Sequence, residues 1–230
     1  MSRLTRKWNL ITERNPGSPI SEGYRLLRTN IEFATNDDKP QIIMVSSSEP
    51  GEGKSTTCAN MAVTFAQANK RVLVIDADLR KPAQHYIFSV SNHKGLTTVL
   101  STRLEPQEVI QRTSTDNLSV LAAGPTPHNP SELLSSKEMG GLLETLRHAY
   151  DLIIIDTPAI MSVTDAQIVA AQSDGVVLVI DSGKVKKEVV LKAKASLAHV
   201  QANLIGAVLN NISRKQADSY SYYYKAGINA

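Results

Sequence analysis

Residues 46–56, with the sequence SSSEPGEGKST, constrain the fold of this 230-residue chain more than any other segment. They follow the apolar run IIMV at residues 42–45 and open a helical pattern that extends to about Ala68. A strand, a glycine-bearing loop that ends in Gly-Lys-Ser and a helix are, in this order, typical of a phosphate-binding P-loop. The segment therefore predicts a binding site for a nucleoside triphosphate.

The P-loop pattern assigns a role to most residues of this segment. Backbone N–H groups of the loop are expected to surround the phosphates, helped by the positive end of the helix dipole. Lys54 is expected to reach the β- and γ-phosphates, and the Ser55 hydroxyl to bind Mg²⁺. Ser48 replaces the first glycine of the general pattern, so the alternative is an ordinary turn, which the flanking strand and helix disfavour. The predicted nucleotide-binding residues are Gly51, Glu52, Gly53, Lys54, Ser55 and Thr56.

Three aspartates follow two other apolar runs. Asp76 and Asp78 end the run at residues 71–76, and Asp156 ends the run at residues 151–156. Residues i and i+2 of a strand face the same side, and ligands bind at the carboxyl edge of open parallel sheets. Each aspartate alone is also compatible with a helix cap or a turn. Together with the P-loop they favour a functional site, in which Asp156 holds Mg²⁺ through water as a Walker B residue.

Strands alternate with helices along the chain, and several strands are apolar throughout. This pattern predicts an α/β fold with a mostly parallel sheet that helices flank on both faces. The region 81–117 is less regular and is expected to hold short helices and loops. The predicted strands span residues 41–47, 71–76, 118–122, 151–156, 175–181 and 204–210, and the predicted later helices span residues 131–149, 163–172 and 184–200.

The domain boundaries follow from local composition. Residues 1–17 are predicted to be a flexible leader, residues 18–212 the folded domain and residues 213–230 a polar tail rich in tyrosine. Ser18 and Pro19 are suited to begin a helix, which we expect over residues 18–35. Its apolar stripe consists of Ile20, Tyr24, Leu27, Ile31 and Ala34.

Composition excludes several functional classes. The net charge of +3 gives no support for nucleic-acid binding. Cys58 is the only cysteine, so an intrachain disulfide is excluded, and it is expected to be a small core residue. We find no run of ~18 apolar residues that would cross a membrane and no signal peptide, so a cytoplasmic protein is expected.

Two further patterns each have two explanations. Glu22, Arg25 and Arg28 lie at three-residue spacing on the first helix, where they form either surface ion pairs, worth about 0.5 kcal/mol or less, or a contact between subunits. The tail holds four tyrosines that no apolar pattern requires. They are either phosphate acceptors or part of an aromatic tail that docks back on the protein or pairs with other tails. The four are Tyr220, Tyr222, Tyr223 and Tyr224.

These motifs occur together, and in combination they resemble the bacterial tyrosine kinases of the capsular and exopolysaccharide type. The resemblance extends from about residue 18 to the end and is strongest for the free-standing cytoplasmic form of Gram-positive bacteria. It rests on the P-loop, the segment DADLRKP at residues 76–82, the segment IIIDTP at residues 153–158, the Glu-x-x-Arg-x-x-Arg pattern and the tyrosine cluster. It implies a P-loop NTPase fold of the deviant Walker class, Mg-ATP as the cofactor and autophosphorylation of the tail in trans.

The resemblance also implies residue roles. Lys54 and Ser55 would bind phosphates and Mg²⁺, and Asp78 and Asp156 would belong to the Mg²⁺ shell. Asp76 would be the base or orienting group for the tyrosine hydroxyl, which has a pKa of about 10 and is protonated at neutral pH. Asn210 stands where related ATPases read the nucleotide base.

Assembly and partners are implied as well. Glu22, Arg25 and Arg28 match the motif through which these kinases form rings, which place the tail of one subunit in the site of the next. A separate membrane adaptor activates the free-standing kinases through its cytoplasmic tail, and it would recruit this chain to the inner face of the membrane. Such a kinase regulates capsule and exopolysaccharide synthesis and acts on protein tyrosines.

Two residues depart from related patterns, and two alternative functions remain open. Ala159 stands where these kinases often have a second proline, and Glu49 stands where the cell-division and partitioning ATPases have a signature lysine. The first alternative is a regulatory ATPase of the partitioning type without kinase activity, against which Glu49 and the tyrosine cluster argue. The second is a non-catalytic assembly subunit in which nucleotide only controls ring formation.

Overall fold

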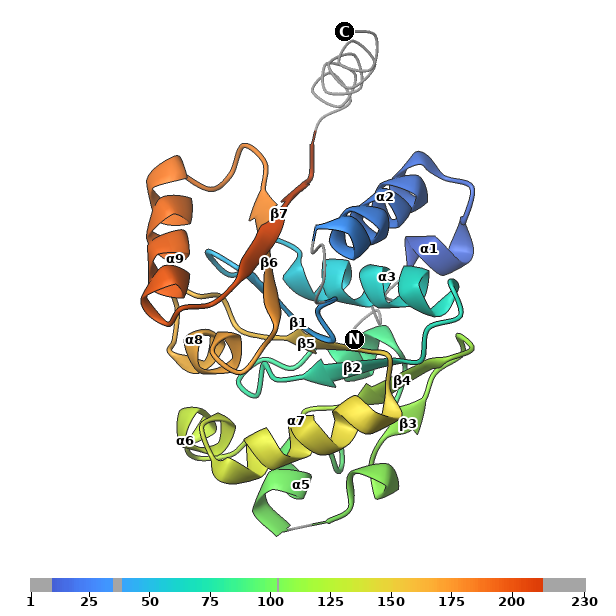
Figure 1. The fold of residues 1–230 in the computed structure, drawn as a ribbon, viewed down its shortest axis with the longest axis vertical. Coiled ribbons are helices and arrows are strands. Elements are labelled where there is room, and N and C mark those ends of the chain that lie inside the picture. Colours follow the sequence, from blue (N-terminus) through green and yellow to red (C-terminus); the bar gives the residue numbers. More distant parts are fainter. Residues whose placement is uncertain (1–9, 35–38, 103, 213–230) are drawn as a thin grey trace, which may run out of the picture.

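The computed structural model describes residues 10–34, 39–102 and 104–212. Within them, seven strands form one sheet that is parallel except for the antiparallel pair at one edge. The predicted α/β fold with a mostly parallel sheet is confirmed (Figure 1). From edge to edge the strands are β3 (Gln111–Arg112), β4 (Leu118–Leu121), β2 (Val72–Asp76), β5 (Leu152–Asp156), β1 (Ile42–Ser47), β6 (Gly175–Asp181) and β7 (Leu204–Asn210).

Helices cover both faces of this sheet, as the uniformly apolar central strands require. One face packs against α1 (Ile11–Arg14), α2 (Pro19–Phe33), α3 (Lys54–Ala66) and α4 (Gln84–Ile87). The other face packs against α5 (Leu96–Thr102), α7 (Lys137–Ala149), α8 (Asp165–Ala170) and α9 (Lys187–His199). Two short elements, the 3-10 turn η1 (Pro106–Glu108) and α6 (Pro130–Leu134), complete the second layer. Each residue of β1, β2 and β5 is buried, so these three strands form the rigid centre that carries the site.

The predicted helix over residues 131–149 is wrong as a single element, because the structure has two helices there. The chain leaves α6 at Ser135, and the Ser136 hydroxyl accepts a hydrogen bond from the backbone N–H of Met139 at 3.3 Å. This serine cap starts α7 anew. Serine caps a helix equally well at a true beginning and at a break, so the apolar spacing alone did not reveal the interruption.

The start of the folded domain also differs from the sequence expectation. Residues 10–14 lie against α3 instead of belonging to a flexible leader: Leu10 is buried, and the backbone N–H and hydroxyl of Thr12 donate to the Asn60 side chain at 3.2 and 2.9 Å. Ser18 caps α2 as predicted, by accepting from the backbone N–H of Ser21 at 3.1 Å. The first residue of the expected apolar stripe, Ile20, is 62% exposed, whereas Ile31 is buried.

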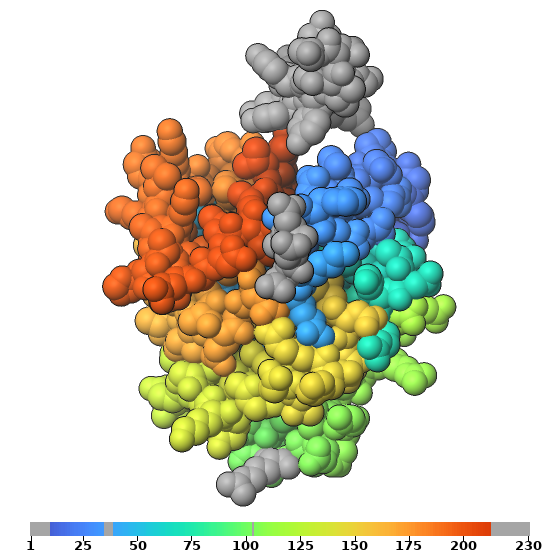
Figure 2. Space-filling view, viewed as in Figure 1, coloured from blue at the N-terminus to red at the C-terminus, as the bar shows by residue number. Residues whose placement is uncertain are grey.

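The edge strand β7 is the least covered part of the sheet. Its side chains are only partly buried or exposed, and no strand beyond it is present among the described residues. A groove of about 250 Å³ separates β7 from α2, with Leu27 and Ile31 on one side and Ile205 and Val208 on the other. Figure 2 shows this face, with the end of the described chain in red and α2 in blue. Within the described segments, no helix combines the length and apolar character that crossing a bilayer requires.

Replacement of Asn60 tests whether α1 belongs to the folded domain. We expect Asn60→Ala to lower the free energy of unfolding by about 1–3 kcal/mol, because it leaves the buried polar groups of Thr12 without a partner. Urea denaturation measures this change, with Asn30→Ala on the exposed side of α2 as the control. Equal stability of the two variants would contradict the contribution of α1.

Candidate functional site

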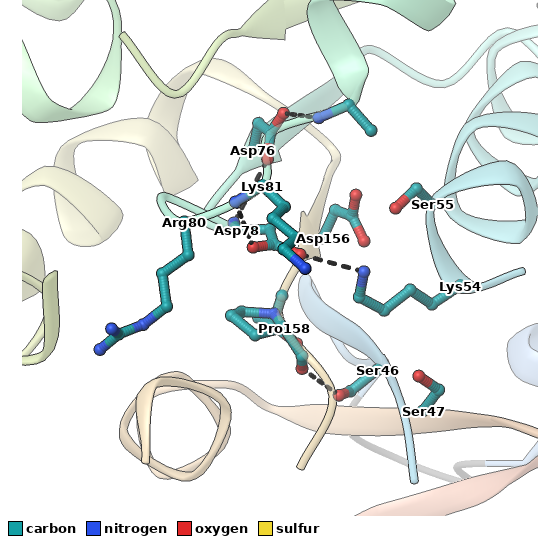
Figure 3. Close-up of polar contacts among 12 residues, drawn as sticks. Ser46, Ser47, Lys54, Ser55, Asp76, Asp78, Arg80, Lys81, Asp156 and Pro158 are labelled. Atoms are coloured by element: carbon teal, nitrogen blue, oxygen red, sulfur yellow. Dashed lines mark hydrogen bonds and ion pairs between the residues drawn. The ribbon is translucent and has the colours of Figure 1, made fainter. Parts of the chain in front are cut away.

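The loop after β1 has the backbone geometry of a phosphate-binding loop. Gly51 and Gly53 have φ angles of 84° and 92°, in the left-handed region that favours glycine. The helix α3 begins directly afterwards at Lys54, so its free N–H groups point into the loop. The predicted P-loop is therefore present, and Lys54 and Ser55 lie opposite the three aspartates (Figure 3).

A buried glutamate and an asparagine brace this loop from behind. The Glu52 side chain is 1% exposed and accepts hydrogen bonds from the backbone N–H groups of Glu49 and Asp181, at 2.5 and 2.9 Å. The Asn210 amide donates to the Glu52 carbonyl at 2.9 Å, and a Cβ at Gly53 would collide with that amide. The Glu52 side chain is thus engaged within the protein, so only the backbone of Glu52 is available to a nucleotide. The Asn210 side chain contacts the P-loop.

The three predicted aspartates converge at the carboxyl edge of the sheet. Asp76 and Asp156 lie side by side in the register of β2 and β5, and both are fully buried. Asp78 is 5% exposed, and its Oδ2 lies 3.1 Å from Nζ of Lys54. Among the described residues, Lys54 is the only cation that forms an ion pair with any of the three. The three carboxyl groups therefore share one cationic partner in the described part of the chain.

The Asp76 side chain is directed toward the turn that follows β2. Its Oδ2 accepts from the backbone N–H groups of Ala83 and Gln84 at 3.0 and 2.9 Å, and its Oδ1 accepts from that of Asp78 at 3.2 Å. Both oxygens are thus occupied within the chain (Figure 3). In this arrangement Asp76 holds the turn that follows β2 and is closed to solvent.

Burial dominates the protonation of this cluster. It raises the pKa of Asp76 to about 8, with a further contribution from the neighbouring charge of Asp156, despite the hydrogen bonds that Asp76 accepts. Burial also raises the pKa of Asp156, although Lys54, Gln84 and Ser55 all favour its charged form. Burial alone would lower the pKa of Lys54, but the carboxylates of Asp156 and Asp78 more than offset it and raise the pKa. A further positive charge would therefore stabilise the ionised form of these carboxyl groups.

The residues at this edge fit a magnesium ion that shares its shell with water and phosphate. Oδ1 of Asp156 is buried without a hydrogen-bond partner in the described part of the chain, although a carboxylate oxygen there needs one. In those same residues, no cluster of three or more His, Cys, Asp or Glu forms a direct metal cage. This suits Mg²⁺, which keeps several waters and is held by one or two protein groups together with substrate phosphates. Ser55 and Asp156 are placed for this role, whereas Asp78 is occupied by Lys54.

The predicted assembly stripe makes contacts inside the chain. Glu22 is 69% exposed and pairs with Arg25 at 2.8 Å. Arg28 points inward, and its Nη1 donates to the Thr64 carbonyl of α3 at 2.8 Å. The three residues thus do not present one outward face. The predicted acceptors Tyr220, Tyr222, Tyr223 and Tyr224 lie outside the described residues.

Two features of the site had no signal in the sequence. Gln84 is fully buried and links Asp156 to α3 from within the region expected to be irregular. Arg80 binds Asp165 through two hydrogen bonds of 2.9 and 3.1 Å, and Asp165 also accepts from the Ser131 hydroxyl at 2.9 Å. This pair of a partly exposed arginine and a buried aspartate joins the loop after β2 to α6 and α8. Nothing in the local spacing of these residues predicts contacts 85 positions apart.

Comparisons with known proteins agree with this geometry. Residues 40–212 match the family model described as AAA domain. The chain is 49% identical over 222 residues to the tyrosine-protein kinase YwqD of Bacillus subtilis (strain 168). The aligned region covers 96% of this chain and 93% of that protein.

Solved structures give the same picture. The crystal structure of the chimerical protein CapA2B2 has a TM-score of 0.86 and 43% identity, over 89% of this chain and 90% of that one. The kinase domain of the Escherichia coli tyrosine kinase ETK also has a TM-score of 0.86, with 35% identity over 90% and 81% of the two chains.

The raised pKa of Asp76 predicts a pH dependence of stability. As the pH rises from about 4 to about 8, unfolded Asp76 loses its proton while folded Asp76 keeps it, so the free energy of unfolding of the nucleotide-free protein should fall. We expect Asp76→Asn to flatten this decline. Chemical denaturation across this range measures it, with Asp116→Asn on an exposed loop as the control. A decline as steep in Asp76→Asn as in the wild type would contradict the assignment.

Proposed function

The chain belongs to the family of bacterial tyrosine-protein kinases, and we propose that it transfers the γ-phosphoryl group of ATP to protein tyrosines, first of all to its own tyrosine cluster. The observation that carries this proposal is the meeting of the P-loop residues Lys54 and Ser55 with Asp76, Asp78 and Asp156 at one sheet edge. Phosphoryl transfer requires little more than such positioning and electrostatic stabilisation. The same cluster supports ATP with Mg²⁺ as the cofactor.

Each residue then has a distinct task. Lys54 exchanges Asp78 for the β- and γ-phosphates when nucleotide binds, which frees Asp78 for the Mg²⁺ shell beside Ser55 and Asp156. Asp76 accepts or orients the proton of the tyrosine hydroxyl, and to accept it Asp76 first has to lose the proton that its raised pKa retains. For this task the hydrogen bonds from Ala83 and Gln84 to Asp76 have to loosen. We propose that the bound nucleotide and the adaptor bring about this rearrangement.

The acceptor tyrosines reach the site in trans. The proposal places residues 213–230 of one subunit in the site of the next within a ring, with Glu22 and Arg25 at the contact between subunits. Arg28 supports this contact indirectly, since it fixes α2 on α3. The adaptor is a membrane protein whose cytoplasmic tail recruits the chain to the inner face of the membrane. Capsule or exopolysaccharide synthesis is the process under control.

A partitioning-type ATPase is not favoured by the site. Glu49 occupies the position of the signature lysine of those ATPases, and this residue is exposed. An acidic group at this position cannot contact the phosphates of a second subunit as a lysine would.

Intact-mass spectrometry after incubation with Mg-ATP and an adaptor-tail peptide tests the kinase proposal. We expect phosphate increments on Tyr220 and Tyr222–Tyr224 in the wild type and their loss in Lys54→Met, because the γ-phosphate then lacks its cationic partner. Lys70→Met, on the exposed segment that follows the same helix, is the control and should be phosphorylated normally. ATP hydrolysis without any increment would favour the regulatory ATPase instead.

Replacement of Glu22 tests the assembly proposal. Glu22 is exposed and forms no hydrogen bond or ion pair with α3 in the described structure, so Glu22→Ala should dissociate rings without loss of nucleotide affinity. Light scattering coupled to size-exclusion chromatography measures ring size, and Glu188→Ala on the exposed side of α9 is the matched control. Rings of unchanged size in Glu22→Ala would contradict the proposed role of Glu22 at the contact between subunits.

A further inference from the structure

One buried amide connects the three parts of the site. Gln84, the first residue of α4, has no exposed surface. Its Nε2 donates to Oδ2 of Asp156 at 2.7 Å and to the Ser55 carbonyl at 3.2 Å, and its backbone N–H donates to Oδ2 of Asp76 at 2.9 Å. A single residue thereby contacts the ends of β2 and β5 and the first turn of α3.

We propose that Gln84 is a positioning residue for the magnesium site: it holds Asp156 and Ser55 in one fixed arrangement, so that a single carboxylate oxygen faces the ion. The inference rests on the proposed assignment of Mg²⁺ to Ser55 and Asp156. It extends that assignment to a residue that itself contacts neither ion nor nucleotide. Groups of this kind orient metal ligands through hydrogen bonds in many metal sites.

The chemistry of the contact requires an uncharged double donor. Both hydrogens of the Gln84 amide are used, one on a carboxylate and one on a carbonyl. The reverse amide orientation would set Oε1 against the carboxylate of Asp156 and is disfavoured by repulsion. Oε1 itself is buried and without a partner among the described residues, so the favourable side-chain contacts all come from Nε2.

The consequence for Asp156 is a difference between its two oxygens. Oδ2 accepts the hydrogen bond from Gln84, while Oδ1 is buried and without a partner in the described structure. The carboxylate therefore cannot rotate freely, and Oδ1 remains the oxygen available to a water of the magnesium shell. The second hydrogen bond ties the backbone of Ser55 to the same amide, so the distance between the two magnesium groups is fixed as well.

Magnesium-dependent nucleotide binding measures this effect without reference to kinase activity. Gln84→Met keeps the length of the side chain and removes the amide. Isothermal titration with ADP, with and without Mg²⁺, should show that the gain in ADP affinity from Mg²⁺ falls about tenfold or more, while metal-free ADP affinity stays unchanged. Gln41→Met is the matched control, because the Gln41 amide likewise donates to two oxygens, the carbonyls of Arg147 and Tyr150 at 2.6 and 2.7 Å, but next to the amino end of β1.

A second variant keeps the test decisive if Gln84→Met fails to fold. Gln84→Asn retains an amide that is one methylene too short to reach Asp156, and thermal unfolding establishes whether each variant is folded. Gln84→Asn should show the same selective loss of the gain in ADP affinity that Mg²⁺ provides. Equal loss of ADP affinity with and without Mg²⁺, or no loss at all, would overturn the positioning role. A wild type whose ADP affinity does not respond to Mg²⁺ would instead overturn the magnesium assignment itself, and the inference with it.

Discussion

Three carboxyl groups lie at one edge of a parallel sheet, and in the described residues one lysine pairs with them; the rest of this structure depends on this constraint. Burial of charge is unfavourable unless the charge is paired, and here the pairing is incomplete. Burial raises the pKa of Asp76 and Asp156, neighbouring carboxylates raise it further, and Oδ1 of Asp156 has no hydrogen-bond partner among the described residues. The proposed Mg²⁺ beside Ser55 and Asp156 would offset negative charge at this point of the site.

The surrounding structure keeps this unfavourable arrangement in place. Asp76 and Asp156 sit at the ends of two fully buried strands that pair with each other. Glu52 and Asn210 fix the P-loop from the side of β6 and β7, while Gln84 fixes it from the side of β2 and β5. The phosphate loop is thus held between two sets of hydrogen bonds that originate in opposite halves of the sheet. Such preorganisation lowers the cost of ordering the site when ligand binds.

The sequence was sufficient for those parts of the site that arise from local pattern. The P-loop and the positions of Asp76 and Asp156 at strand ends follow from apolar runs and glycines that lie close together in the chain. The inward side chain of Glu52 and the bridge made by Gln84 were not predictable in the same way. Each depends on residues 72 to 129 positions away, and neither residue type signals a buried contact by itself. The inward direction of Arg28 was missed for a related reason, since three-residue spacing does not say which neighbour an arginine meets.

The parallel topology also bears on how an acceptor tail can reach the site. β7 runs parallel to β6 and β1, so it ends at the same carboxyl edge as the strands that carry the aspartates. Its last residue, Asn210, is hydrogen-bonded to the P-loop, and the described chain ends two residues later. The described chain therefore ends next to the phosphate loop, with β1 and β6 between its last strand and the carboxylates of β2 and β5. The proposed transfer between subunits therefore requires a neighbouring subunit to present its tail at this same carboxyl edge, where the P-loop and the aspartates lie.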